Sequence, residues 1–384
     1  MTAVETSLVL PASDGRLVTH RLGRPREFPV PSSPPTSRVA FAAAHVVGVP
    51  GDRTALDWDA TLAYRRHLWT HGFRVAEAMD TAQRGAGLDW ATTRELIRRS
   101  VAEAHAVGGG IACGAGTDHL PPDAPVSLAD VRAAYEEQGA FVEGEGAQTI
   151  VMASRALARQ ARSADDYREV YGQVLRQLTH PAILHWLGEP FDPALRGYWG
   201  STDLDEATDL VLELIDEHRD RIDGIKISLL DADREVALRR RLPEGVRLYT
   251  GDDFNYVELI RGDGHGHSDA LLGVFDAIAP AAGAALAALD AGDVARYEVL
   301  LAPTVPLARH LFSEPTYNYK TGIVFLAYLN GHQESFSMVG GLETARSAVH
   351  LAETVVLADR AGLLHDPEQA AARASAVFAA AGIT

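Results

Sequence analysis

Short apolar runs alternate with longer segments of helical periodicity along this chain, and that alternation limits its fold more than any other feature. "VAFAAAHVV" at residues 39–47 precedes a predicted helix at residues 59–71, and "FRVAEAM" at residues 73–79 precedes one at residues 90–106. Strands that are apolar on both faces and alternate with helices are typical of a parallel sheet covered on both sides.

The series continues with further runs of the same kind. The next, "GGIACGAG", precedes a predicted helix at residues 127–139. The other five runs are residues 147–154, 181–188, 223–228, 246–253 and 264–270. Eight strand and helix units over about 250 residues match a (β/α)8 TIM barrel better than an open sheet.

The regions outside the barrel differ in composition. Residues 6–22 read as two short strands around an Asp14-Gly15 turn, and a Pro-rich connector follows. We therefore assign residues 1–36 to an N-terminal β-hairpin with its connector and residues 37–285 to the barrel. The tail, residues 286–384, is rich in Ala and Leu with helical periodicity, which predicts a C-terminal helical extension.

Charge and cysteine content limit the class of partner. The net charge is -17, which disfavours nucleic acid because phosphate binding requires a basic face. The start of the chain lacks the basic and apolar regions of a secretory signal, and we find no apolar run that would span a membrane. A single cysteine, Cys113, agrees with a reducing compartment, so we expect a cytoplasmic protein that acts on a small molecule.

Polar side chains follow most of the predicted strands, where a barrel of this kind carries its active site. His265 and His267 are assigned to the end of the eighth strand. The candidates for substrate binding are Asp80, Thr81, Asp118, Ser154, Arg155, Ser228, Asp252, His265, His267 and Ser268.

Lys226 stands in the run "IDGIKISLL", where a buried strand would call for Val, Ile or Leu. Burial in an apolar barrel would lower the pKa of this amine and make it a nucleophile that forms a Schiff base with a carbonyl group. The alternative is that the side chain reaches solvent or pairs with Asp223, Asp231 or Asp252.

Three segments resemble the dihydrodipicolinate synthase and N-acetylneuraminate lyase superfamily. "DGIKIS" is similar to its Gly-Ile-Lys strand, "LYTGDD" to its Gly-Asp-Asp turn, and "MDTAQRGAGLDWATTRELI" lies where it has a Gly-Thr-Thr-Gly-Glu loop. The resemblance covers residues 37–285 and points to a divergent bacterial branch with a longer helical tail. It implies Lys226 as the Schiff-base nucleophile, Thr81 as a ligand of the substrate carboxylate, and a homo-oligomer, either a dimer or a tetramer.

The chain departs from the family pattern at two places. Ala82 stands at the second threonine of the loop, and "IVMASRALARQ" contains no tyrosine where relatives place their general acid/base. His185 or Tyr198 could take over the proton transfer, since either side chain can move protons at a suitable pKa.

The resemblance therefore implies a lyase, aldolase or dehydratase of carbohydrate metabolism, without a cofactor, that acts on a 2-keto acid or keto sugar derivative through a Lys226 imine. Two alternatives remain open. His185, His265 and His267 could bind a divalent metal, since histidine is a common ligand of zinc-like ions. The barrel could also bind a ligand without catalysis, which would explain the missing tyrosine and threonine.

Overall fold

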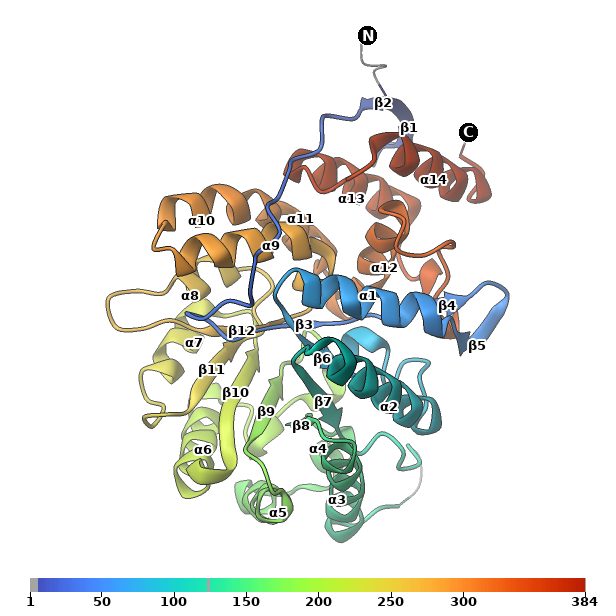
Figure 1. The fold of residues 1–384 in the computed structure, drawn as a ribbon. Coiled ribbons are helices and arrows are strands. Elements are labelled where there is room, and N and C mark those ends of the chain that lie inside the picture. The colour runs from blue at the N-terminus through green and yellow to red at the C-terminus, as the bar shows by residue number, and fades with distance from the viewer. Residues whose placement is uncertain (1–5, 123–124, 384) are drawn as a thin grey trace. The chain divides into compact units, whose positions relative to one another are not determined.

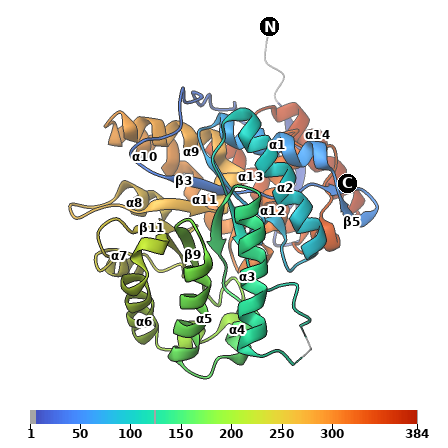
Figure 2. The same ribbon diagram turned by 60° about the horizontal axis from the view of Figure 1, so that its bottom comes forward.

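The computed structural model describes residues 6–122 and 125–383, which divide into two compact units. The barrel unit consists of residues 38–44 and 74–273, and the helical unit is the remainder. Figures 1 and 2 show the labelled elements of both units.

The barrel unit contains eight parallel strands that close in the order β10-β11-β12-β3-β6-β7-β8-β9, with β9 pairing β10. The strands are β3 (Ala40–Ala43), β6 (Arg74–Glu77), β7 (Ile111–Ala115), β8 (Gln148–Val151), β9 (Ala182–Leu187), β10 (Ile222–Ser228), β11 (Arg247–Thr250) and β12 (Asp269–Leu272). The predicted (β/α)8 barrel is confirmed.

Helices alternate with these strands along the chain and lie outside them in the barrel unit (Figures 1 and 2). They are α2 (Trp90–Val107), α3 (Leu128–Gly144), α4 (Arg155–Gln160), α5 (Ala164–Gln177), α6 (Leu204–Glu217), α7 (Ala232–Arg239) and α8 (Tyr256–Arg261). Polar side chains cap the N-termini of several of these helices. Asp89 accepts a hydrogen bond from Thr92 N at 2.8 Å at the start of α2, and Ser127 forms a capping box with Asp130 at the start of α3.

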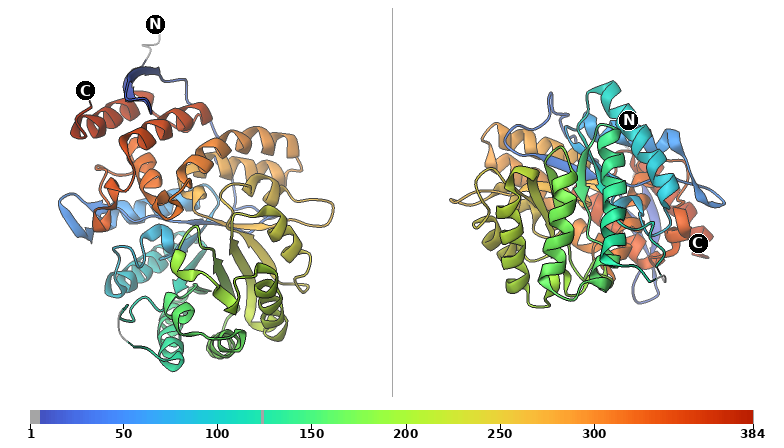
Figure 3. Two further views of the ribbon diagram at one scale, coloured as in Figure 1. Left: turned by 180° about the vertical axis from the view of Figure 1, so that it is seen from behind. Right: turned by 90° about the horizontal axis from the view of Figure 1, so that it is seen from below.

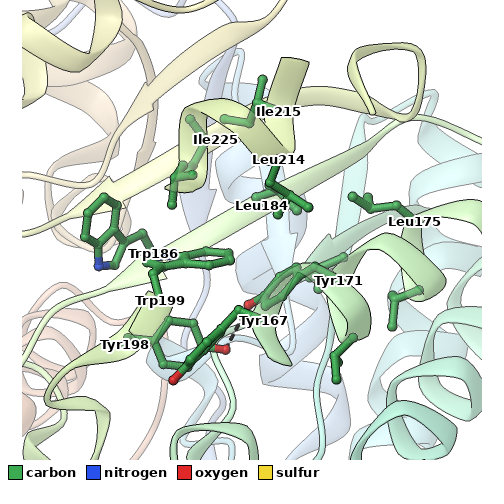
Figure 4. Packing of buried hydrophobic residues seen from close by; sticks show 14 of the residues in the cluster. Tyr167, Tyr171, Leu175, Leu184, Trp186, Tyr198, Trp199, Leu214, Ile215 and Ile225 are labelled. Atoms are coloured by element: carbon green, nitrogen blue, oxygen red, sulfur yellow. Dashed lines mark hydrogen bonds between the residues drawn. The ribbon is translucent and has the colours of Figure 1, made fainter. Parts of the chain in front are cut away.

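Two separate apolar clusters show which way each strand residue faces. The first joins side chains from seven of the eight strands, which can meet only inside the barrel. Its strand members are Phe41, Ala43, Ala76, Ala112, Ile150, Ile183, Tyr249 and Leu271. The second, which we call the outer cluster, joins β8, β9, β10 and β11 to helices α3, α5 and α6 and lies outside the strands (Figure 4). Since successive strand residues face opposite sides, these clusters fix the orientation of the residues between them.

The helical unit holds both ends of the described chain and a group of helices, coloured orange to red in Figure 3. Its strands are β1 (Ser7–Pro11), β2 (Leu17–Arg21), β4 (Gly48–Val49) and β5 (Asp52–Leu56). Its helices are α1 (Trp58–Thr70), α9 (Val274–Asp290), α10 (Val294–Leu301), α11 (Val305–Leu311), α12 (Tyr319–Leu329), α13 (Ala348–Ala361) and α14 (Pro367–Ala380). β1 and β2 pair antiparallel, which confirms the predicted hairpin. Helices α9 to α14 confirm the predicted C-terminal helical extension.

No helix in the part of the chain that the structure describes is both long enough and apolar enough to cross a membrane.

Histidines gather in the helical unit. The ring of His67 lies 4.4 Å from that of His332 and 4.7 Å from that of His71, measured between ring centroids. Burial lowers the pKa of His67 to about 2 and the pKa values of His71 and His332 to about 4, and the neighbouring histidines add to each shift. The folded protein therefore holds these side chains neutral at pH 7.

This cluster predicts a loss of stability in mild acid. Below the unfolded-state pKa of about 6.5 the unfolded chain takes up protons that the folded chain refuses, so each histidine costs up to about 1.4 kcal/mol per pH unit down to its folded pKa. We expect His332→Gln to reduce the fall in melting temperature between pH 7 and pH 4.5. The exposed His105 in α2 supplies the control variant His105→Gln. Equal acid sensitivity in both variants would contradict the prediction.

Candidate active site

Lys226 lies inside the barrel on β10. Its neighbours Ile225 and Ile227 belong to the outer cluster, so Lys226 faces the interior together with Gly224 and Ser228. The residue is 8% exposed. The amine of Lys226 is therefore buried in the barrel interior, and the alternative that its side chain reaches solvent is wrong.

Gly251 provides the space for this side chain. It follows β11, and its amide donates a hydrogen bond to the Ile227 carbonyl oxygen at 2.8 Å. A Cβ at this position would lie 2.7 Å from Lys226 Cε and would also collide with Ser228 Oγ. The long lysine side chain thus passes over a residue that has no side chain.

Burial lowers the pKa of Lys226 to about 8, although the carboxylates of Asp253 and Asp80 favour its charged form. At pH 7 about one amine in ten is then unprotonated, against about one in two thousand for an ordinary lysine. Lys226 is therefore available as a nucleophile at neutral pH.

His185 on β9 is the register partner of Lys226 and is 1% exposed. Burial and the adjacent Lys226 hold its pKa well below the usual range, so the ring is neutral. Its Nε2 lies 3.3 Å from Ser228 Oγ, and its Nδ1 is buried with no hydrogen-bond partner among residues 6–122 and 125–383. A neutral imidazole in this position can accept a proton from a group bound at Lys226.

Asp80 and Thr81 begin the short 3-10 helix Asp80–Ala82 directly after β6. The chain reaches it through Ala78, whose φ of 53° lies in the left-handed region that few residues other than glycine adopt. Thr81 is buried, and the buried Ala82 beside it carries no hydroxyl group.

The second carboxylate near Lys226 is Asp253, not the predicted Asp252. Asp252 accepts hydrogen bonds from the amides of Phe254 at 2.9 Å and Asn255 at 3.0 Å, so it holds the turn that leads to α8. Asp253, at the same strand end and 3% exposed, interacts electrostatically with Lys226. Only the folded turn distinguishes these two adjacent aspartates.

The predicted position of His265, His267 and Ser268 at the end of the eighth strand is wrong. β12 begins at Asp269, so these residues precede the strand and lie at the end of the barrel opposite to the strand carboxyl ends. Both histidines are exposed, and the buried Ser268 donates a hydrogen bond to Glu235 at 2.7 Å. The Gly-rich segment is a loop because its glycines and histidines supply no apolar alternation.

The three histidines of the metal hypothesis therefore do not come together around one site. His185 faces the barrel interior, whereas His265 and His267 lie before β12, at the amino ends of the strands. Among the described residues, no group of three or more His, Cys, Asp or Glu side chains is placed to hold a metal ion.

Asp118, after β7, is paired with Arg84, a buried residue that the sequence did not single out. Arg84 Nη2 lies 2.7 Å from one Asp118 oxygen, and Gln138 donates to the same carboxylate at 3.1 Å. Burial acts to raise the pKa of Asp118, but the Arg84 guanidinium holds it below its usual value. Arg84 also donates to the Gly114 carbonyl oxygen, so this network ties the ends of β6 and β7 together.

Ser154, Arg155 and Tyr198 are engaged in local structure. Ser154 caps α4 by accepting a hydrogen bond from Leu157 N at 2.9 Å, and Arg155 forms an exposed ion pair with Asp192 at 2.6 Å. The Tyr198 hydroxyl accepts a hydrogen bond from Ser154 N and lies 2.8 Å from the Tyr171 hydroxyl, within the outer cluster (Figure 4). Burial raises the pKa of Tyr198 well above 10.

A family model described as "Protein of unknown function (DUF993)" matches residues 8–383. The chain belongs to this family.

Comparisons with individual proteins confirm the resemblance stated from the sequence. A curated 4-hydroxy-tetrahydrodipicolinate synthase from Azoarcus sp. (strain BH72) is 37% identical over 116 residues, which span 30% of this chain and 38% of that protein. The dihydrodipicolinate synthase structure from Aquifex aeolicus has a TM-score of 0.66 at 15% identity and covers 85% of this chain and 99% of its own. The corresponding structure from Thermotoga maritima has a TM-score of 0.64 at 14% identity, with coverage of 85% and 99%. The structural matches establish the shared barrel fold.

A feature of composition marks Lys226 in this DUF993 chain more sharply than its position does. The chain has 35 basic residues, of which only Lys226 and Lys320 are lysines. The other 33 basic residues are arginines. The amine of Lys226 on β10 can lose its proton, which a guanidinium group at that position could not do.

Glu235 on α7 is a second buried titratable group in the barrel unit. Its two oxygens accept hydrogen bonds from Ser268 Oγ at 2.7 Å and Thr250 Oγ1 at 2.9 Å, and burial raises its pKa to about 8. The folded protein therefore keeps a proton on this carboxyl group at pH 7 that the unfolded chain releases near pH 4.3.

The free energy of unfolding is expected to fall as pH rises from about 4.5 to about 8. Glu235 contributes up to about 1.4 kcal/mol to this fall for each pH unit. Glu235→Gln should remove that loss, because its amide is neutral at every pH. Its melting temperature should exceed that of the wild type at pH 8 and equal it at pH 5. The exposed Glu244→Gln serves as the control and should follow the wild type at both values. If the melting temperature of Glu235→Gln does not exceed that of the wild type at pH 8, the prediction that folded Glu235 keeps its proton is wrong.

Proposed function

We propose that this protein is a lyase, of the aldolase or dehydratase type, that acts on a 2-keto acid or keto sugar derivative through an imine at Lys226. The observation that carries the proposal is the buried amine on β10, with its pKa lowered to about 8 and a neutral His185 beside it. The sequence similarity to a 4-hydroxy-tetrahydrodipicolinate synthase supports the same class of reaction.

The reaction begins when the unprotonated Lys226 amine attacks the substrate carbonyl carbon; the carbonyl oxygen then leaves as water with one proton from the amine and one taken up from solvent. The resulting protonated imine withdraws electrons, so a carbon–carbon bond one carbon away can break or form, or water can be eliminated. When the carbon–carbon bond breaks, the hydroxyl group beside it loses a proton, and His185 takes up this proton because its ring is neutral and lies next to Lys226. Thr81 and the amides near it bind the part of the substrate beside the carbonyl group.

Borohydride trapping tests this proposal. The full-length protein is incubated with pyruvate, with hydroxyacetone and with a panel of keto sugars, reduced with sodium borohydride, and digested for mass analysis. We expect the mass of the reduced substrate on the peptide that contains Lys226. The chain has one other lysine, so Lys320→Arg leaves a single lysine and makes the assignment unambiguous. No adduct at Lys226 with any member of the panel would overturn the proposal.

A binding barrel without turnover is the second candidate. It is favoured by Ala82, which replaces a family hydroxyl, and by Tyr198, whose hydroxyl is held in the outer cluster by Ser154. The same panel of carbonyl compounds distinguishes a lyase from a binding barrel, because a binding barrel would retain its ligand and release no product. Product formation that depends on His185 would exclude it.

A further inference from the structure

We infer that Ser228 is a catalytic residue whose hydroxyl group carries a proton from the Lys226 amine to the substrate carbonyl oxygen while the imine forms. The inference rests on the proposed function, which requires an imine at Lys226. It goes beyond that function because it assigns the proton transfer of the first step to a second residue on the strand of the nucleophile.

Imine formation needs a group that moves a proton between two atoms on one carbon. After the amine attacks, the nitrogen carries an extra proton and the oxygen carries a negative charge. A hydroxyl group that contacts both atoms can accept the first proton and donate its own. Two hydroxyl groups expected from the resemblance are not available here, because Ala82 has none and the hydroxyl of Tyr198 is held in the outer cluster by Ser154 N.

Ser228 is placed beside the lysine by its strand. It ends β10, two residues after Lys226, and its side chain faces the barrel interior on the same side. A Cβ on Gly251 would collide with Ser228 Oγ and lie 2.7 Å from Lys226 Cε, so the hydroxyl group and the lysine side chain border the same point. Gly188 N donates a hydrogen bond to the Ser228 carbonyl oxygen at 3.0 Å, which fixes the backbone at this position.

His185 holds the Ser228 hydroxyl group in place. Its Nε2 lies 3.3 Å from Ser228 Oγ, and both residues are 1% exposed. Since Nδ1 is buried and has no partner in the described part of the chain, a proton on Nε2 leaves no buried N–H group without an acceptor. His185 therefore donates to Ser228 Oγ.

This arrangement leaves the capacity that the transfer needs. A serine hydroxyl group accepts two hydrogen bonds and donates one. With one acceptor position filled by His185, Ser228 keeps a second acceptor position for the amine and its own proton for the substrate oxygen. The site thus contains a hydroxyl group that can both take and give a proton without a change in its charge.

The transfer conserves atoms and charge. The Nζ–C bond forms while an electron pair of the carbonyl group moves to the oxygen. The nitrogen passes one proton to Ser228 Oγ, and the hydroxyl group gives its own proton to that oxygen. The C–O bond then breaks, and the oxygen leaves as water with a second proton from solvent. The nitrogen keeps one proton as the protonated imine, and Ser228 ends as it began.

Ser228→Ala in the Lys320→Arg protein tests the inference, because that protein has a single lysine. The protein is mixed with hydroxyacetone or with pyruvate, borohydride is added at timed intervals, and the adduct on the peptide that contains Lys226 is measured by mass spectrometry. We expect the rate of adduct formation to fall at least about 10²-fold, the lower limit for a positioned acid–base group. Ser228→Thr keeps a hydroxyl group and suits a strand, so it should restore most of the rate.

Acetic anhydride distinguishes proton transfer from a structural effect. It acetylates an unprotonated amine and releases acetate, so no carbonyl oxygen has to leave as water. Lys226 should be acetylated at the same rate with and without Ser228→Ala. Ser100→Ala on α2 is the matched control, because it also removes a fully buried serine hydroxyl group, one with no partner among the described residues. Its trapping rate should equal that of the Lys320→Arg protein.

Equal trapping rates with and without Ser228→Ala would overturn the inference and leave the lyase proposal intact. An acetylation rate that falls as much as the trapping rate would also overturn it, because Ser228 would then act only by placing Lys226. The same holds for a Ser228→Thr protein, folded by circular dichroism, that traps as slowly as Ser228→Ala. No adduct at Lys226 of the Lys320→Arg protein with any member of the carbonyl panel would overturn the lyase proposal as well.

Discussion

Replacing Lys226 by arginine is expected to abolish imine formation while the protein stays folded. A guanidinium keeps its proton up to a pH above about 12, so adduct formation should fall by at least about 10³-fold. The positive charge opposite Asp80 and Asp253 is retained, which separates loss of the nucleophile from loss of charge balance. The measurement is the rate of adduct formation, followed by mass spectrometry.

The matched control is Lys320→Arg, which removes the only other lysine. That lysine donates a hydrogen bond to the Tyr317 carbonyl oxygen at 3.0 Å, and its replacement should leave the trapping rate unchanged. In the Lys320→Arg protein the rate should rise with pH up to about 8, where half of the Lys226 amines are unprotonated. A midpoint near the ordinary lysine value, about 10.4, would show that Lys226 is not desolvated during the reaction.

Gly251→Ala is expected to impair the site through steric contact alone. The added Cβ would lie 2.7 Å from Lys226 Cε, so the lysine must move by a large fraction of an ångström. Displacements of that size can lower rates by about 10²-fold, and overpacking of this kind costs about 1–3 kcal/mol of stability. We expect slower trapping at Lys226 together with a lower melting temperature.

Gly264→Ala is the control for this substitution. The loop position has no atom within 4 Å of its added Cβ, so both the trapping rate and the melting temperature should match the wild type. A Gly251→Ala protein that traps carbonyl compounds at the wild-type rate would show that Lys226 does not need its observed path over Gly251.

The sequence determined the fold to a large extent. Seven of the eight strands lie within the predicted apolar runs or begin one residue before them, and helices α1 and α2 begin and end within one residue of their predicted limits. This accuracy has a physical cause. Parallel strands buried on both faces need continuous apolar runs, and most runs here are followed by a segment of helical periodicity that begins at a polar cap such as Asp89 or Ser127.

The sequence also placed Lys226 and His185, because each interrupts an apolar strand with a polar group. It failed at His265 and His267, where the loop before β12 was taken for the strand itself. His265 and His267 occupy alternate positions, as residues on one face of a strand do, but this spacing does not show where the strand begins. The start of a strand is set by its hydrogen bonds to the neighbouring strands.

Only the tertiary structure decided which charged groups act together. Asp252 and Asp253 are adjacent and chemically identical, yet one holds a turn and the other interacts electrostatically with Lys226. Tyr198, a plausible acid in the sequence, is held in the outer cluster by its bond from Ser154. Such assignments depend on which side of a strand or turn each side chain leaves, and on contacts between residues far apart in the chain. The sequence alone determined the barrel and its amine, whereas folding determined the charges around that amine.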